Sequence, residues 1–412
     1  MNDERRAIEA LRAGVPNRAA IRLLGTAETE ISERFLENLE RCQPRFKNGE
    51  QMSGQIIAGG FGSGKSHLLG YLQQLALDQN FIVSWVVISK ETPLFDPGKL
   101  YAAAIRNATV PFLNDDVMTA ILSAKFPEGD GYDDLARWAE STEAGLSPLF
   151  SALLHLIPLN TDPERIKEIG RFLSGGKLGL AKIRQWLREI GAVKRFPIKA
   201  NKQSELTLQR LRFVPHLIAA AGYNGWVVLL DEAELIGRYS LLQRGRSYAE
   251  LARWLGLDAM VNVPGVVTVA AITDDFIDEV INKRRDDEQV PLKLAGRHER
   301  KAAERARLGI ESLRTKPVLL QSPNAALLDT TLKKIRGCYA KAYDWDVTAA
   351  EIGEITAAKS MRQYIKSWVT AWDLERLYGS RPEIETVKVI PNYEETREIE
   401  TVAEPSDGAD DE

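Results

Sequence analysis

The sequence predicts an α/β fold with a parallel central sheet, a large helical insertion and a helical C-terminal part. Its first strand, residues 55–58, leads through a glycine-rich loop directly into a helix. Further apolar runs follow at residues 81–89, 226–230, 266–272 and 317–321, and stretches with helical periodicity lie between them. Apolar runs that alternate with helices are typical of strands buried in a parallel sheet.

The same patterns divide the 412 residues into four regions. Residues 1–48 carry apolar positions at helical spacing, which predicts two or three helices before the first strand. Residues 49–322 are the predicted core, with a helical insertion at about residues 108–215 where glycine and proline interrupt the pattern. Residues 323–380 are purely helical in pattern and suit a small lid. Residues 381–412 are acidic, contain proline and are expected to be mostly disordered.

The loop after the first strand has the pattern Gly59-x-x-x-x-Gly64-Lys65-Ser66. Its glycines leave room for backbone N–H groups to surround a polyphosphate, and the helix that begins near Lys65 directs its positive end at the same anion. Lys65 would neutralise the β- and γ-phosphates, and the Ser66 hydroxyl would ligate Mg²⁺. The alternative is a glycine-rich turn without a ligand. The candidate phosphate-binding residues are Gly59, Gly60, Phe61, Gly62, Ser63, Gly64, Lys65, Ser66 and His67.

Two carboxylates, Asp231 and Glu232, follow the apolar run of residues 226–230. The C-terminal end of such a strand is where ligands of open α/β sheets bind. Asp231 would hold Mg²⁺ through water, and Glu232 would polarise the water that attacks ATP. The alternative is that Asp231 caps the next helix and Glu232 interacts with its dipole. The glycine loop elsewhere in the chain favours the catalytic interpretation.

Four further residues are candidates for sensing or stabilising the phosphates. Thr273 ends the neighbouring strand and could orient the attacking water, or it could cap the next helix. Arg284 and Arg285 follow that helix and could stabilise phosphate charge in a neighbouring subunit of a ring, or they could be solvated. Arg362 begins an amphipathic helix and could reach the phosphates from a lid, or its stem could pack on that lid.

Composition excludes several classes of protein. Hydrophobic residues make up 44% of the chain and charged residues 27%, as in ordinary globular proteins. No apolar run is long enough for a membrane span and the N-terminus lacks a signal-peptide pattern, so a cytoplasmic protein without a membrane partner is expected. The two cysteines and four histidines have no metal-ligand spacing, which disfavours structural zinc and disulfides.

Charge is distributed unevenly along the chain. Residues 161–212 contain 13 basic and 5 acidic residues, whereas residues 381–412 contain 3 and 11. The basic stretch would suit double-stranded DNA or an acidic partner, or it could simply solvate the insertion. Arginines close to Glu232 could meet a nucleic acid or a neighbouring subunit, or pair with Glu232 and Glu250. The candidate contacts are Lys194, Arg195, Lys199, Arg244 and Arg246.

Together these features resemble AAA+ P-loop ATPases with an additional strand in the sheet. The resemblance becomes closer in four phrases, residues 6–17, 58–69, 87–94 and 231–238, which are similar to the ATP-binding proteins of BREX-type bacterial anti-phage systems, the BrxD family. ATPases of other helicase-containing defence operons, such as the Shango type, are also similar.

The resemblance implies an AAA+ fold with a helical lid, ATP and Mg²⁺ as ligands, and hydrolysis of ATP to ADP and phosphate. It further implies a homo-oligomer that works with a helicase or another protein of the defence operon. In the related origin-recognition clade the segment before the core contacts adenine, which implies Val15, Pro16 and Arg18 as base-pocket residues here. The chain departs from the AAA+ pattern in having Thr273 in place of Asn and no second glycine before Arg362.

Two functions of different classes remain compatible with the sequence. The first is an ATP-hydrolysing protein that binds or remodels DNA during phage defence. The second is a nucleotide-gated scaffold that turns ATP over slowly and recruits partners without touching DNA. A metabolic kinase with the same loop is disfavoured, because the long helical lid and the arginines near residue 284 have no place in it.

Overall fold

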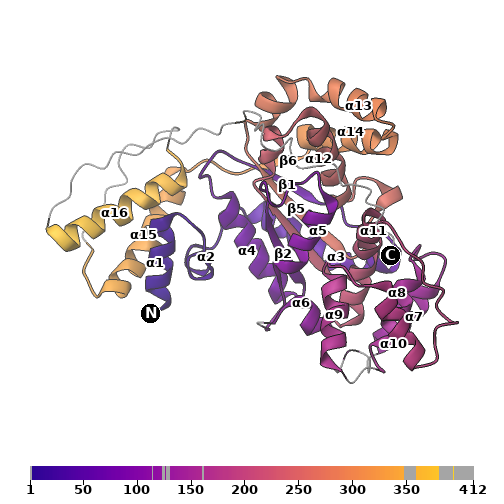
Figure 1. Ribbon diagram of the computed structural model, residues 1–412. Coiled ribbons are helices and arrows are strands. Elements are labelled where there is room, and N and C mark those ends of the chain that lie inside the picture. Colours follow the sequence, from indigo (N-terminus) through magenta and orange to yellow (C-terminus); the bar gives the residue numbers. More distant parts are fainter. Residues whose placement is uncertain are drawn as a thin grey trace.

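A six-stranded sheet lies at the centre of the described residues, which are 2–113, 115–122, 126, 130–159, 162–347, 359–379 and 393 (Figure 1). Its strand order is β3-β2-β4-β5-β1-β6. The parallel strands are β1 (Gln55–Ala58), β2 (Ile82–Val87), β4 (Trp226–Asp231), β5 (Val266–Ile272) and β6 (Pro317–Leu319). The predicted α/β fold with a parallel central sheet is therefore confirmed, and every predicted strand lies where the sequence placed it.

One edge of the sheet differs from the prediction. β3 (Ala108–Thr109) pairs with β2 in antiparallel orientation, at the point where the sequence placed the start of the helical insertion. A strand of two residues carries no periodic pattern, so sequence periodicity cannot reveal it. The sheet is thus mostly parallel, with one short antiparallel edge strand.

The central strands are apolar throughout because helices cover both faces of the sheet. Trp226, Val228 and Leu230 of β4 join one hydrophobic cluster, and Val227 and Leu229 join the other. The second cluster contains α3 (Thr29–Lys47) and α4 (Lys65–Asp78). The first contains α5 (Pro97–Arg106), α11 (Gln203–Ala220), α12 (Leu241–Trp254), α13 (Asp286–Gly296) and α14 (Arg300–Thr315).

Helices occupy most of the chain between β3 and β4. They are α6 (Val117–Ile121), α7 (Asp130–Glu140), α8 (Pro148–Leu156), α9 (Pro163–Leu173), α10 (Leu180–Glu189) and α11. Their buried side chains belong to the same cluster as one face of the sheet, so the core continues into this region. Short 3₁₀ segments η2 (Ala233–Arg238) and η3 (Ala259–Val261) and the π-helix η4 (Ile277–Asn282) join the later elements.

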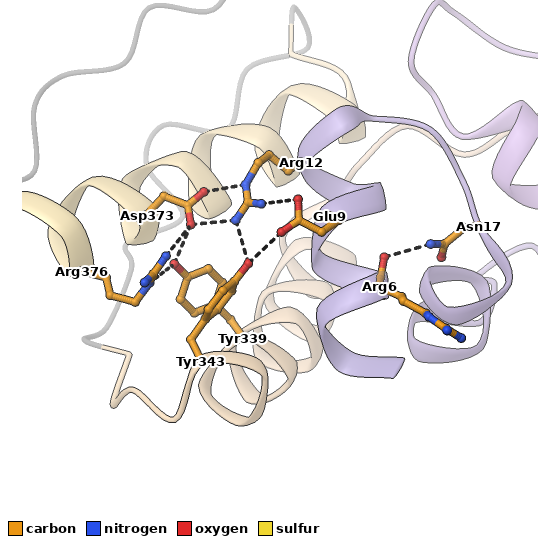
Figure 2. Close-up of polar contacts among 8 residues, drawn as sticks. All are labelled: Arg6, Glu9, Arg12, Asn17, Tyr339, Tyr343, Asp373 and Arg376. Atoms are coloured by element: carbon orange, nitrogen blue, oxygen red, sulfur yellow. Dashed lines mark hydrogen bonds and ion pairs between the residues drawn. The ribbon is translucent and has the colours of Figure 1, made fainter. Parts of the chain in front are cut away.

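The first two helices and the last two helices meet in a separate cluster, here called the terminal helical unit. It consists of α1 (Asp3–Ala13), α2 (Arg18–Leu24), α15 (Ala325–Tyr343) and α16 (Met361–Tyr378), and α1, α15 and α16 lie to one side of the sheet in Figure 1. Arg12 of α1 bonds Asp373 of α16 at 2.7 Å and the Tyr343 hydroxyl of α15 at 3.0 Å (Figure 2). The Tyr339 hydroxyl donates to Asp373 at 2.7 Å. This polar network joins α1 to two helices that lie more than 300 residues further along the chain.

The predicted disordered tail, residues 381–412, lies outside the described residues except for Tyr393. No helix in the described ranges is both long and apolar enough to span a bilayer. The proposed division into regions at residues 48, 322 and 380 stays a prediction.

Candidate functional site

A cavity of about 750 Å³ lies between the glycine loop, the C-terminal ends of β4 and β5, and the terminal helical unit. Because parallel strands end at the same edge of the sheet, residues from distant parts of the sequence meet there. The sequence candidates that line this cavity are Val15, Pro16, Phe61, Gly62, Ser63, Gly64, Lys65, Ser66, His67, Asp231, Glu232, Thr273 and Arg362.

The glycine loop has the conformation that an anion cradle needs. Gly62 and Gly64 have φ values of 78° and 111°, which side chains rarely tolerate. A Cβ on Gly59 would lie 2.7 Å from the Ser63 hydroxyl oxygen. α4 begins at Lys65 without a side-chain cap, so the positive end of the helix faces the loop.

Lys65 folds back onto its own loop. Its Nζ donates to the carbonyl oxygens of Gly59 at 2.7 Å and Gly60 at 3.3 Å. The buried Ser63 hydroxyl has no hydrogen-bond partner among the described residues. Both groups would be satisfied by phosphate oxygens, so the loop fits a polyphosphate.

The acidic residues at the end of β4 differ in burial. Asp231, the last residue of β4, is buried, whereas Glu232 is exposed and has a left-handed backbone with φ of 56°. The Glu232 N–H donates to Asp231 Oδ1 at 3.0 Å. Oxygen ligands are those that Mg²⁺ prefers, so the Ser66 hydroxyl and Asp231 could hold this ion together with phosphate oxygens. No group of three or more His, Cys, Asp or Glu side chains able to hold a metal was found in the described chain.

Glu234 is a site residue that the sequence interpretation missed. It lines the same cavity from η2, and its Oε2 is buried without a described hydrogen-bond partner. Burial raises the pKa of Glu234 to about 7, although the Lys65 ammonium acts in the opposite direction. The signal that could have identified it is a third acidic residue directly after an apolar strand.

Thr273 lies at the end of β5, between the glycine-loop strand β1 and the Asp231 strand β4. Its buried hydroxyl bonds the hydroxyl of Tyr393, which also donates to Asp275 Oδ1 at 2.8 Å. Arg284 donates to the carbonyl oxygens of Gly237, at 2.9 Å, and of Tyr393. Thr273 is therefore placed at the cavity, whereas Arg284 lies behind it and is bonded within its own chain.

Arg285 forms an ion pair with Glu288 on the surface and does not line the cavity. Its side chain is 65% exposed, and its backbone is left-handed at the start of α13. It could therefore reach a neighbouring molecule, whereas it does not reach the cavity of its own chain.

Arg362 brings the terminal helical unit into contact with the glycine loop. Its N–H donates to the Gly62 carbonyl oxygen at 3.2 Å, and its guanidinium lies 5.1 Å from the centre of the Phe61 ring. A Cβ on Gly62 would lie 2.7 Å from the hydroxyl oxygen of Ser360, the N-cap of α16. The first turn of α16 therefore lies directly on the loop.

The far end of the cavity is mostly apolar, lined by the terminal helical unit. Val15 and Pro16 are joined there by residues the sequence did not single out, including Leu24, Leu327 and Ile365. Arg18 lies outside this lining and donates to Gln74 Oε1 at 3.1 Å. A phosphate cradle at one end and an apolar surface at the other suit a nucleotide.

Some predicted nucleic-acid contacts are not available at the surface. Arg244 is only 3% exposed and pairs with the buried Asp286 at 2.8 Å, which agrees with the alternative of pairing within the chain, although its partner is neither Glu232 nor Glu250. Its partner lies 42 residues downstream, which sequence spacing could not reveal. Arg246 pairs with Glu299 at 2.7 Å. In the segment between α10 and α11, Lys194, Arg195 and Lys199 are exposed, and Arg195 pairs with Glu140 at 2.8 Å.

These features define the class of the protein as a P-loop nucleotide-binding protein. A family model described as BREX system ATP-binding protein BrxC/D matches residues 1–124 and 186–371. Since the match covers well over half of the chain, the chain belongs to this family of ATP-binding proteins of an anti-phage system. No curated protein and no solved structure gives a significant match.

Proposed function

We propose that the protein is an AAA+ ATPase of BREX defence, in which the C-terminal helices α15 and α16 act as a lid that follows the state of the nucleotide. The contact of Arg362 with Gly62, from α16 to the glycine loop, carries this proposal. A loop that rearranges around phosphate must move or release this contact. The rest of α16 is joined to α1 through Arg12 and Asp373, so the whole terminal helical unit would respond.

The sheet order supports the assignment to the additional-strand P-loop class. β5 lies between β1, which leads into the glycine loop, and β4, which ends in Asp231. Thr273, directly after β5, would therefore lie between bound phosphates and the carboxylates, which supports a role in orienting the attacking water.

The positions of the side chains support a hydrolysis step. Lys65 would leave the Gly59 and Gly60 carbonyl oxygens and donate to the β- and γ-phosphates, and Ser66 and Asp231 would hold Mg²⁺. The ion would neutralise phosphate charge when bound. Glu232 would accept a hydrogen bond from the water that attacks the γ-phosphate, and Thr273 would orient that water. Arg362 would stabilise the transferred charge from the lid.

The proposed partners extend this function beyond one chain. We propose a cytoplasmic homo-oligomer in which Arg285, or Arg284 after release from Gly237, faces the nucleotide of a neighbouring subunit. The protein would act on double-stranded DNA together with a helicase or another protein of the operon. The exposed Lys194 and Lys199 support a DNA contact.

A specific observation favours the alternative of a nucleotide-gated scaffold. Several cations of the basic stretch are already paired within the chain: Lys182 with Glu168, Arg165 with Glu189, and Arg195 with Glu140. Cations that are paired within the chain attract DNA less strongly than free ones, which favours a protein that recruits partners without touching DNA. ATP turnover measured with and without DNA distinguishes the two functions, because only a protein that acts on DNA should be accelerated by it.

The substitution Glu232→Gln tests the catalytic assignment. The amide keeps the shape of the side chain but cannot accept a proton, so we expect ATP to bind normally while kcat falls by about 100-fold or more. Single-turnover hydrolysis and a filter-binding measurement of ATP give the two quantities. Hydrolysis at the parental rate would show that another group activates the water, and Glu234 would then be the first candidate.

A further inference from the structure

A second cavity, of about 280 Å³, lies among the helices that precede β4. Two loops form most of it: residues 176–179, between α9 and α10, and residues 199–201, before α11. Side chains of α8, α9 and α11 complete the lining with Leu149, Phe172 and Arg210. Of the candidate residues from the sequence only Lys199 belongs to this lining, as a possible nucleic-acid contact, and the lining shares no residue with that of the nucleotide cavity.

Arg210 is a buried cation with unused hydrogen-bond donors. Its side chain is fully buried, at 0% exposure. Nη2 donates to the Gly176 carbonyl oxygen at 2.8 Å, and the guanidinium lies 4.3 Å from the centre of the Phe172 ring. Nε and Nη1 are buried without a hydrogen-bond partner in the described chain. A guanidinium stays charged in proteins, so two of its nitrogens lack the partners that burial demands.

The surroundings of Arg210 supply no counter-charge. The described lining contains Lys177, Lys199 and Arg210 but no Asp or Glu side chain. Burial lowers the pKa of Arg210, and the Tyr101 hydroxyl is the neighbour that acts against this change. A buried cation without a carboxylate partner destabilises the folded state unless an anion binds beside it.

Two helix ends add to the positive potential of the cavity. α10 begins after Gly179 and α11 begins after Lys202, and neither helix has a side-chain cap. Gly179 and Gln203 both belong to the cavity lining. Uncapped helix N-termini favour anions through their backbone N–H groups, so the helix dipoles act in the same direction as the three cations. The Asn201 side-chain oxygen is also buried without a described partner and offers an acceptor.

We propose that this cavity binds a small organic anion, whose phosphate or carboxylate group meets Arg210 while an apolar or aromatic body lies against Leu149, Leu178 and Leu206. The volume of the cavity is close to the lower end of small-molecule sites, roughly 300 Å³. A phosphate ester and a carboxylate share the chemistry that Arg210 recognises. Residues 125–185, which contribute half of the site, lie outside the family match, so the ligand would distinguish this chain from the family pattern.

Calorimetric titration of the full-length protein, saturated with Mg²⁺ and ADP, tests the proposal with phenyl phosphate and benzoate as probes. The nucleotide occupies the glycine loop, so heat from the probes reports on other sites. We expect one probe to bind at a single site and Arg210→Met to weaken it by about tenfold or more, because charge-assisted hydrogen bonds are lost. Which probe binds more tightly decides between a phosphate and a carboxylate ligand.

Two further variants protect the test against misfolding of Arg210→Met. Lys199→Gln removes an exposed cation of the cavity lining. It should lower the affinity for the probe by about threefold and leave the affinity for ADP unchanged. The control Lys293→Gln, at an exposed lysine of α13 outside the lining, should change nothing. The proposal is overturned if neither probe binds. It is equally overturned if Arg210→Met binds the probe as tightly as the parent does. If Arg210→Met does not fold, the same result for Lys199→Gln overturns the proposal.

Discussion

The two cavities both present cations and helix N-termini to an anion, but they differ in acidic residues. The nucleotide cavity places Asp231, Glu232 and Glu234 near Lys65, whereas the described lining of the second cavity contains no carboxylate. Acidic side chains beside a phosphate site are useful where a divalent cation must be held and a water activated. The comparison supports the two proposals, that the first site performs chemistry and that the second only binds its ligand.

The largest effect that can test this comparison is expected for Lys65→Ala. The variant loses the charge that neutralises the phosphates, so the affinity for Mg²⁺ and ATP should fall by about 100-fold or more. Fluorescence titration with a labelled ATP analogue measures the loss. Binding of phenyl phosphate at the second cavity should be unchanged, and a joint loss at both cavities would show that they are not independent.

The walls of the two cavities also differ, and a substitution in the wall of the nucleotide cavity tests this difference. Its expected effect is smaller than that of Lys65→Ala. Only the nucleotide cavity is closed by the terminal helical unit, in which Arg12 connects Glu9, Tyr343 and Asp373 (Figure 2). Burial alone would lower the pKa of Arg12, but hydrogen bonds to Asp373 and Glu9 raise it above its ordinary value. The charged form of Arg12 is therefore stabilised in the folded protein.

Arg12→Met should destabilise the terminal helical unit by about 1–3 kcal/mol, because Asp373 and Glu9 lose a charged donor. Thermal unfolding and ADP titration measure the result, and ADP should bind more weakly while the second cavity keeps its affinity. Arg6→Gln on the same helix is the matched control, since the Arg6 side chain is mostly exposed and forms a surface ion pair with Asp3 at 3.6 Å. An ADP affinity equal to that of the parent would show that this unit does not close the nucleotide cavity.

The same contrast explains how much of the molecule the sequence could predict. The strands were predictable because each is a continuous apolar run, and the glycine loop because its residues are adjacent in the sequence. The two-residue strand β3 carries no such pattern. Arg244 and Arg210 both lie on helices where an arginine usually indicates a solvated face, and both are buried. Their surroundings come from distant segments, Asp286 in one case and residues 176–179 in the other, and only the fold brings these together.

The smallest effect is expected for a substitution of Glu234. It tests the difference between the cavities through the pH dependence of thermal stability. Burial raises the pKa of this carboxyl group from the ordinary 4.5 to about 7 in the folded protein. Between these values the folded state holds a proton that the unfolded state has released, so stability falls as pH rises through this window. Glu234→Gln removes the titrating group, and its melting temperature should exceed that of the parent by about 2–4 °C at pH 8 and by less at pH 5.

Two variants serve as controls for this prediction, one in each cavity. Glu232→Gln removes an exposed carboxylate whose charge is a minor cause of the raised pKa of Glu234, so the pH dependence of unfolding should remain and its window should shift only slightly downward. Arg210→Met removes a cation that stays charged from pH 5 to pH 8, so any change in its melting temperature should be the same at both values. If Glu234→Gln followed the parent at every pH, the carboxyl group would be ionised in its cavity, and Lys65 would be its counter-ion before any nucleotide binds. The nucleotide cavity would then hold a balanced ion pair, and its contrast with the uncompensated Arg210 would be sharper still.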